Sequence, residues 1–163
     1  TFHSTASDAA SLAKEVNVRK LFLGHFSSRY ANSDQHIIEA RELFQAVEGF
    51  DWVGFYRVVA PNLLKIGPYQ GGHGCLVIPF DQGVCGAAAR YKTIQLVDDV
   101  DLFDGHIACS SSTKSELVIP CFNQSGQLLG VLDIDSDQPH FFTWQDADQL
   151  DLMLRQLFQN TSS

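Results

Sequence analysis

The sequence predicts an α+β fold with a central antiparallel sheet of about six strands and terminal helices packed on one face. Strand-like segments follow one another with short turns between them, which favours antiparallel pairing. Helical patterns gather near the two ends of the chain. Because 163 residues suit one hydrophobic core, we expect residues 1–163 to form a single domain, with residues 1–7 as a frayed N-terminus.

The first part of the chain has the pattern of helices. Between residues 8 and 30, apolar side chains recur at mixed spacings, many of them three or four, which predicts one or two helices. Ser33 and Asp34 are a candidate N-cap for a further helix. Its apolar stripe ends before Gly49, where we expect the helix to stop.

Six short segments rich in β-branched, aromatic and aliphatic residues follow, and turn residues separate them. The last two flank a four-residue turn, which predicts an antiparallel hairpin. A helix in the middle of this region and one after it complete the prediction, and a long loop of the kind that is usually functional lies between strands. The strands are 51–60, 63–66, 75–78, 93–97, 116–122 and 127–134, the helices 83–92 and 143–158, and the loop 98–113.

Composition excludes two classes of partner. The formal net charge is -8, from 19 acidic and 11 basic residues, whereas nucleic acids and anionic membranes require a basic surface. No apolar run reaches the roughly 18 residues of a membrane span, and the N-terminus has no signal-peptide pattern. We therefore expect a cytoplasmic protein with reduced thiols, bound neither to nucleic acid nor to a membrane.

Four cysteines need an explanation, because a domain of this length does not require disulfide staples. Cys121 lies in an apolar strand and is expected to be a buried hydrophobe. Cys85 lies near a predicted helix start, where the helix dipole would lower its pKa. Cys75 begins a strand after a Gly-rich turn, and Cys109 lies in the polar loop. Taken alone, Cys109 is as compatible with a reactive thiol as with a buried one.

A zinc site is a competing use of these residues. Cys75, Cys85, Cys109 and His106 supply the ligand types of a Cys3His site. Structural zinc sites normally draw their ligands from closely spaced cysteine pairs, and the three cysteines here are ten and twenty-four positions apart. We therefore expect no metal.

Acidic and aromatic residues form two further candidate groups. Asp133 and Asp135 share one face of a strand, and the hairpin would bring Glu116 of the neighbouring strand to the same end. Close carboxylates raise one another's pKa, although solvated acids at strand ends are an equal alternative. Trp52 and Tyr56 share a face with Gly54 between them, which offers a floor for a ligand or, more simply, core packing.

Six segments together resemble one enzyme family. They are WVGFY (52–56), GPYQG (67–71), GVCG (83–86), FDGHIAC (103–109), SELVIP (115–120) and GVLDIDS (130–136). In this order they resemble free methionine-R-sulfoxide reductase, a GAF-domain enzyme, from about residue 50 to the last helix. The resemblance implies reduction of free L-methionine-(R)-sulfoxide to L-methionine without a bound cofactor. A thioredoxin-type dithiol would restore the thiols.

The resemblance also implies roles for the cysteines. Cys109 matches the catalytic cysteine and Cys75 the cysteine that resolves its oxidised form. Cys85 matches a third cysteine that can enter disulfide exchange, and Cys121 has no counterpart. The expected chemistry is attack of the Cys109 thiolate on the sulfoxide sulfur, a sulfenic acid, and then a disulfide.

The substrate-binding residues come from the same resemblance. Glu116, Asp133 and Asp135 match carboxylates that hold and activate the substrate, with Glu116 or Asp135 as proton donor and Asp133 or Asp135 paired with the ammonium group. Trp52 and Tyr56 match aromatic pocket walls. N–H groups of the loop would hold the substrate carboxylate; the residues are Asp104, Gly105, His106, Ile107 and Ala108.

Two other interpretations remain open at this point. A non-catalytic GAF module that binds a small ligand or senses redox state would share the fold and several motifs. A structural or interaction protein would carry its acids only as a solvated face. The sequence also does not decide between a monomer and a homodimer.

Overall fold

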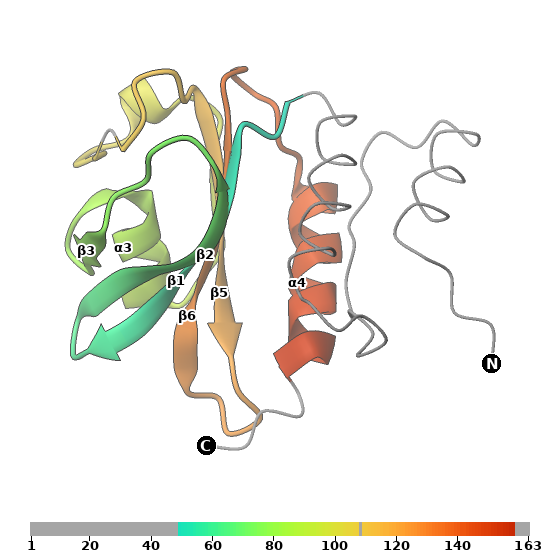
Figure 1. Ribbon diagram of the computed structural model, residues 1–163. Helices are drawn as coiled ribbons and strands as arrows, with labels where there is room; N and C mark the ends of the chain where they lie inside the picture. Colours follow the sequence, from blue (N-terminus) through green and yellow to red (C-terminus); the bar gives the residue numbers. More distant parts are fainter. Residues whose placement is uncertain (1–48, 108, 159–163) are drawn as a thin grey trace, which may run out of the picture. The chain divides into compact units, whose positions relative to one another are not determined.

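The structure is a computed structural model that describes residues 49–107 and 109–158 (Figure 1). The helices predicted over 8–30 and before Gly49, and the expected frayed terminus 1–7, lie outside the described residues. The described elements alternate strands with two helices and one short 3-10 helix. They are β1 (Trp52–Ala60), β2 (Leu63–Gly71), β3 (Val77–Pro79), α3 (Gly83–Tyr91), β4 (Gln95–Val97), η1 (Val100–Leu102), β5 (Ser115–Phe122), β6 (Leu128–Ser136) and α4 (Trp144–Phe158).

The strands form one six-stranded sheet in the order β3-β2-β1-β6-β5-β4, and every neighbouring pair is antiparallel. The predicted α+β fold with an antiparallel sheet of about six strands is therefore confirmed. The predicted hairpin is β5 and β6, joined across the turn in which Asn123 Oδ1 accepts hydrogen bonds from the backbone N–H groups of Ser125 and Gln127.

The two described helices cover opposite faces of the sheet (Figure 1). Buried residues of α3 belong to one core cluster with side chains from the strands, such as Tyr56 of β1 and Val131 of β6. These strand side chains lie on the face of the sheet that α3 covers. The intervening positions of β5, Leu117 and Ile119, point to the other face and are fully buried. Since β5 is buried along nearly its whole length, it is a central strand covered on both faces. The sequence predicted one face for the terminal helices and assigned no face to the internal helix, α3.

Small residues allow α3 to lie close to the sheet. Residues 86–89 are one glycine and three alanines, all buried. A Cβ atom on Gly86 would overlap the carbonyl oxygen of Pro79, so the close approach requires glycine there. The helix ends at Lys92, which adopts the left-handed conformation with φ of 56°.

Two local features differ from or complete the sequence prediction. Strand β2 continues to Gly71 rather than ending at residue 66, because the Gly-rich segment pairs with β1 through Tyr69 and Gly71. In front of α4, the backbone N–H and Oγ1 of Thr143 donate to Asp146 Oδ2, and the Asp146 N–H donates to Thr143 Oγ1. These three hydrogen bonds form a capping box at the start of α4.

Candidate active site

The acidic residues converge because three adjacent strands are in matching register. Glu116 of β5 is the pairing partner of Asp135 of β6, which in turn faces Trp52 of β1. Asp133 lies one side chain further along the same face of β6, opposite Gly54. All three carboxyl groups therefore point toward α3, as the predicted hairpin required.

A disulfide joins Cys75 and Cys109, which are 34 positions apart in sequence, with Cα atoms 5.2 Å from each other. Cys75 lies just before β3, and Cys109 lies in the loop between η1 and β5. Both residues are partly exposed. The two cysteines to which the family resemblance gives catalytic and resolving roles can therefore form a direct bond.

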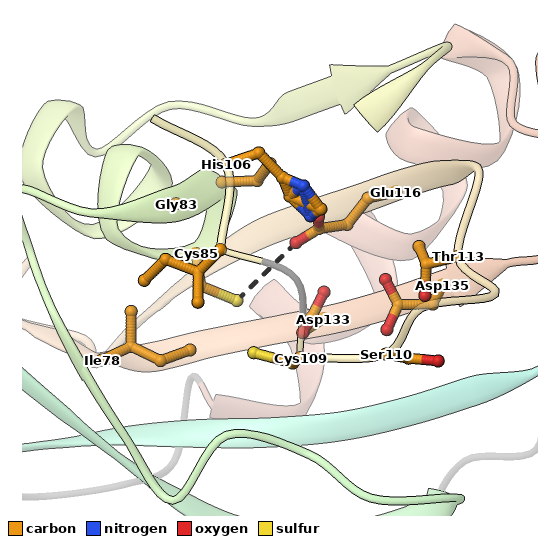
Figure 2. Close-up of a pocket in the computed structure, with 12 residues that line it drawn as sticks. Ile78, Gly83, Cys85, His106, Cys109, Ser110, Thr113, Glu116, Asp133 and Asp135 are labelled. Atoms are coloured by element: carbon orange, nitrogen blue, oxygen red, sulfur yellow. Dashed lines mark hydrogen bonds between the residues drawn. The ribbon is translucent and has the colours of Figure 1, made fainter. Parts of the chain in front are cut away.

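Cys85 is a free, buried thiol on the first turn of α3. Its Sγ donates a hydrogen bond to Glu116 Oε1 at 4.0 Å (Figure 2). Burial, followed by the negative charge of Asp133 and Glu116, raises the Cys85 pKa well above its ordinary value. The sequence suggested a lowered pKa from the helix dipole, which was wrong because burial among carboxyl groups outweighs the dipole.

The carboxyl groups hold protons more strongly than usual. Burial is the main cause for each of them, and the charge of Asp133 adds to it at Glu116 and Asp135. The pKa of Asp133 rises to about 6 and that of Asp135 to about 9, and the pKa of Glu116 is also raised. Asp135 therefore keeps its proton to a higher pH than Asp133 does.

These groups line one pocket, whose cavity of about 20 Å³ has room for roughly one water molecule. Seven of the predicted site residues line it: Cys85, His106, Ile107, Cys109, Glu116, Asp133 and Asp135. The sequence reasoning missed five others: Ile78, Gly83, Val84, Ser110 and Thr113. Ser110 could have been found, because it directly follows Cys109 in the polar loop.

The predicted aromatic residues lie beside the pocket rather than among its lining residues. Trp52 is 5% exposed and stacks between Tyr56 and Tyr69, at ring-centroid distances of 5.8 and 5.5 Å. Of the two interpretations of Gly54, the structure agrees with core packing rather than a ligand floor, because the Trp52 ring covers Gly54 and a Cβ atom there would overlap that ring. The buried Trp52 Nε1 has no hydrogen-bond partner among the described residues.

Backbone hydrogen bonds, one from the start of α3 and one within the loop, hold the loop before Cys109 in place. Gly105, with φ of 75°, accepts a hydrogen bond from the Gly83 N–H through its carbonyl oxygen at 3.0 Å. The His106 N–H donates to Phe103 O at 3.1 Å, so it is already used in this state. Asp104 and Gly105 do not line the pocket, and Ala108 lies outside the described residues.

The thiols and acids also bear on metal binding. The considered Cys3His set is not available in this state, because Cys75 and Cys109 are bonded to each other. A different set forms among the described residues: one ligand atom each from Cys85, Glu116 and Asp133, all within 4.8 Å of one another.

Comparison with known proteins identifies the family. The GAF domain family model matches residues 38–159. GAF domain-containing protein A of Dictyostelium discoideum is 45% identical over 108 residues, which cover 66% of this chain and 68% of that protein. Free methionine-R-sulfoxide reductase of Escherichia coli is 40% identical over 115 residues, covering 71% of this chain and 68% of that enzyme.

A solved structure agrees with these relatives. Free methionine-R-sulfoxide reductase from Neisseria meningitidis, in complex with its substrate, aligns with a TM-score of 0.68 and 30% identity over 95% of this chain and 90% of that one. Within the described part of the chain, no helix has the length and apolar character needed to cross a membrane. With a family model matched over most of its length and a fold shared with these relatives, the chain belongs to the GAF domain family.

Proposed function

We propose that the protein reduces free L-methionine-(R)-sulfoxide to L-methionine, with cysteine thiols as the electron source. The observation that carries this proposal is the Cys75–Cys109 pair beside a pocket lined by three carboxyl groups with raised pKa. The E. coli relative with the same activity in its name supports the substrate and its R configuration.

In the first step, the Cys109 thiolate attacks the sulfoxide sulfur. A protonated carboxyl group, from Glu116 or Asp135, gives a proton to the sulfoxide oxygen as that oxygen passes to the Cys109 sulfur. Methionine leaves with its sulfur reduced by two electrons, and Cys109 becomes a sulfenic acid, which is oxidised by two electrons. The raised pKa values of both carboxyl groups support this role, because an ionised carboxylate has no proton to give.

In the second step, the Cys75 thiol attacks the Cys109 sulfenic acid. A sulfur–sulfur bond forms, the S–O bond breaks, and the oxygen leaves as water. The disulfide between Cys75 and Cys109 supports Cys75 as the resolving cysteine. Cys85 is less suited to that role, because its thiol is buried and its raised pKa leaves little thiolate.

Recognition of a free amino acid follows from the charges. The ionised carboxylate of Asp133 would pair with the substrate ammonium group, and its Oδ1 atom, buried and without a partner among the described residues, supports this. Trp52 would contribute a cation–π contact, and Tyr56 would support the Trp52 ring from behind. N–H groups in residues 104–108 would hold the substrate carboxylate. Methionine within a peptide lacks both charges and would be excluded.

The cavity of about 20 Å³ belongs to the disulfide-bonded state and is too small for an amino acid. We therefore infer that the substrate binds when Cys109 is a free thiol and its loop is no longer tied to Cys75. Once methionine has left and the disulfide has formed, the pocket would no longer accept the substrate.

We also propose that an external thioredoxin-type dithiol re-reduces the disulfide, with no bound cofactor. Leu76, next to Cys75 in sequence, is 71% exposed and offers an apolar contact for such a protein. Attack on the Cys75 sulfur would release Cys109 as the thiolate for the next turnover. Such a donor works in a reducing compartment, which suits the expected cytoplasmic location.

The test is incubation of the purified full chain with racemic free methionine sulfoxide and dithiothreitol, followed by measurement of methionine. We expect conversion to stop at one half, because only the R form reacts. Conversion of both forms would contradict stereospecificity, and no methionine would favour a non-catalytic GAF module. Cys75→Ser should still release methionine in one turnover but should not be recycled by thioredoxin, and full recycling would transfer the resolving role to Cys85.

A further inference from the structure

We propose that Cys85, Glu116 and Asp133 bind a divalent metal ion with affinity for sulfur, such as Zn²⁺ or Cd²⁺. Their ligand atoms, one from each residue, lie within 4.8 Å of one another. The three residues belong to α3, β5 and β6, so the backbone of a helix and two central strands holds them together. Figure 2 shows the thiol and the two carboxyl groups converging on the same side of the pocket.

One oxygen atom of this cluster needs a partner. Asp133 is 5% exposed, and its buried Oδ1 has no hydrogen-bond partner among the described residues. Burying a carboxylate oxygen without compensation is costly, and a metal ion supplies the missing interaction. The pocket cavity of about 20 Å³, which Asp133 lines, has the size of a water molecule and therefore of a small hydrated site.

The donor set selects the class of metal. Zinc accepts thiolate, imidazole and carboxylate ligands, and it commonly uses three protein ligands with a fourth position left for water. His106 lines the same pocket but is not among the residues whose ligand atoms converge, so the fourth position is left for water. Mg²⁺ and Ca²⁺ prefer six or more oxygen ligands, which a cluster with one sulfur and two carboxyl groups does not offer.

Charge and proton balance favour binding of a dication. The Cys85 thiol and the Glu116 carboxyl group would lose their protons to solvent while metal–sulfur and metal–oxygen bonds form. Three anionic ligands and a doubly charged ion then leave a local charge of -1, the same as that of the ionised Asp133 with its two protonated neighbours before binding. No oxidation or reduction is involved.

The site does not require the catalytic thiols, because Cys75 and Cys109 are bonded to each other in this state. The metal can therefore bind to the disulfide form, in which the proposed reaction does not take place. If the function proposed above holds, the ion also blocks the carboxyl groups that would receive the substrate, and it inhibits the enzyme in competition with free methionine sulfoxide.

The experiment titrates Cd²⁺ into the full chain in its disulfide form, in which only Cys85 and Cys121 are free thiols. We expect one equivalent to produce the ultraviolet charge-transfer absorption of a cadmium–thiolate bond. Cys85→Ser should abolish this absorption, whereas Cys121→Ser, the matched control at a buried cysteine on the opposite face, should keep it. Absorption that persists in Cys85→Ser, or no absorption in the parent chain, would overturn the site.

Two further variants keep the test informative if Cys85→Ser does not fold. Glu116→Gln and Asp133→Asn retain the shape of the pocket, and each should weaken Cd²⁺ and Zn²⁺ binding at least about tenfold in calorimetric titration. Unchanged affinity in both would overturn the proposal. Reductase activity, measured on metal-free protein with a chelator present, tests the proposed function separately, so either idea can fail without the other.

Discussion

The two faces of the β5–β6 hairpin are both buried, yet they differ in chemistry. The face covered by α4 carries aliphatic side chains, including Leu117, Ile119 and Ile134, each 2% exposed or less. The face covered by α3 buries the carboxyl groups of Glu116 and Asp133 at 7% and 5% exposure. Burying aliphatic side chains stabilises the fold, whereas burying carboxyl groups opposes folding and is expected where they serve a reaction.

The comparison predicts that residues on or above the α3 face determine activity. The largest expected effect is that of Cys109→Ser, because a hydroxyl group is a much poorer nucleophile toward sulfur than a thiolate. Reduction of free methionine-(R)-sulfoxide with dithiothreitol should fall at least about a thousandfold, without loss of the fold. Parental activity in this variant would contradict the assignment of the nucleophile.

Removing the acid at Glu116 should separate activity from stability. We expect Glu116→Gln to lower the turnover number about 10²-fold or more, because it removes a proton donor or substrate ligand. The free energy of unfolding should stay equal or rise, since the variant no longer buries an ionisable group. Urea denaturation and steady-state kinetics measure the two effects, and a large loss of stability with unchanged turnover would contradict the interpretation.

The opposite pattern is expected on the α4 face. Ile119→Ala should reduce the free energy of unfolding by about 2–5 kcal/mol, because the Ile119 side chain is fully buried and its truncation leaves a cavity in the core. The activity per folded molecule should change little. Denaturant unfolding gives the first quantity, and kinetics at a temperature where the variant is folded give the second. A selective loss of turnover would mean that this face also serves the reaction.

A further expected effect is a difference in the pH dependence of stability. Asp135 has an ordinary pKa near 3.8 and a pKa of about 9 in the folded protein, mainly because of burial. The folded state therefore prefers the protonated carboxyl group, so its stabilising contribution is complete below about pH 4 and is lost as the pH rises toward 9.

Asp135→Asn should accordingly become more stable relative to the parent chain as the pH rises over that range. Unfolding curves of both proteins between pH 4 and pH 9, with a chelator present, measure this difference. A constant difference across the range would show that Asp135 is not buried in its protonated form.

The antiparallel sheet, its last hairpin and the placement of the acidic residues on that hairpin could be predicted from the sequence. The alternation of Asp133, Ile134 and Asp135 assigned each residue to its face, and the hairpin turn assigned Glu116 to the same end as the acids. The packing of Trp52 over Gly54 could not be predicted, because it depends on Tyr69 from a strand that continues further than its apolar pattern indicates. The position of the Trp52 ring therefore depends on a contact with Tyr69 of the neighbouring strand, which the local sequence around Trp52 does not reveal.

The properties of the thiols show the same limit. The family resemblance indicated that Cys75 and Cys109 act together, although no local pattern links residues 34 positions apart. Burial, followed by the charges of carboxyl groups from β6 and β5, raises the Cys85 pKa and so reverses the shift that its helix position suggests. The sequence thus indicated the candidate residues and the mutual effect of the carboxyl groups, but not the burial that raises the Cys85 pKa.

The most direct test of the central account is a single-turnover experiment without external reductant. The fully reduced chain is mixed with excess free methionine-(R)-sulfoxide, methionine is quantified, and cysteine linkages are mapped by mass spectrometry. The account predicts one methionine per chain, a Cys75–Cys109 disulfide, and unmodified thiols at Cys85 and Cys121. Absence of methionine, or a disulfide formed at Cys85 in place of Cys75, would contradict it.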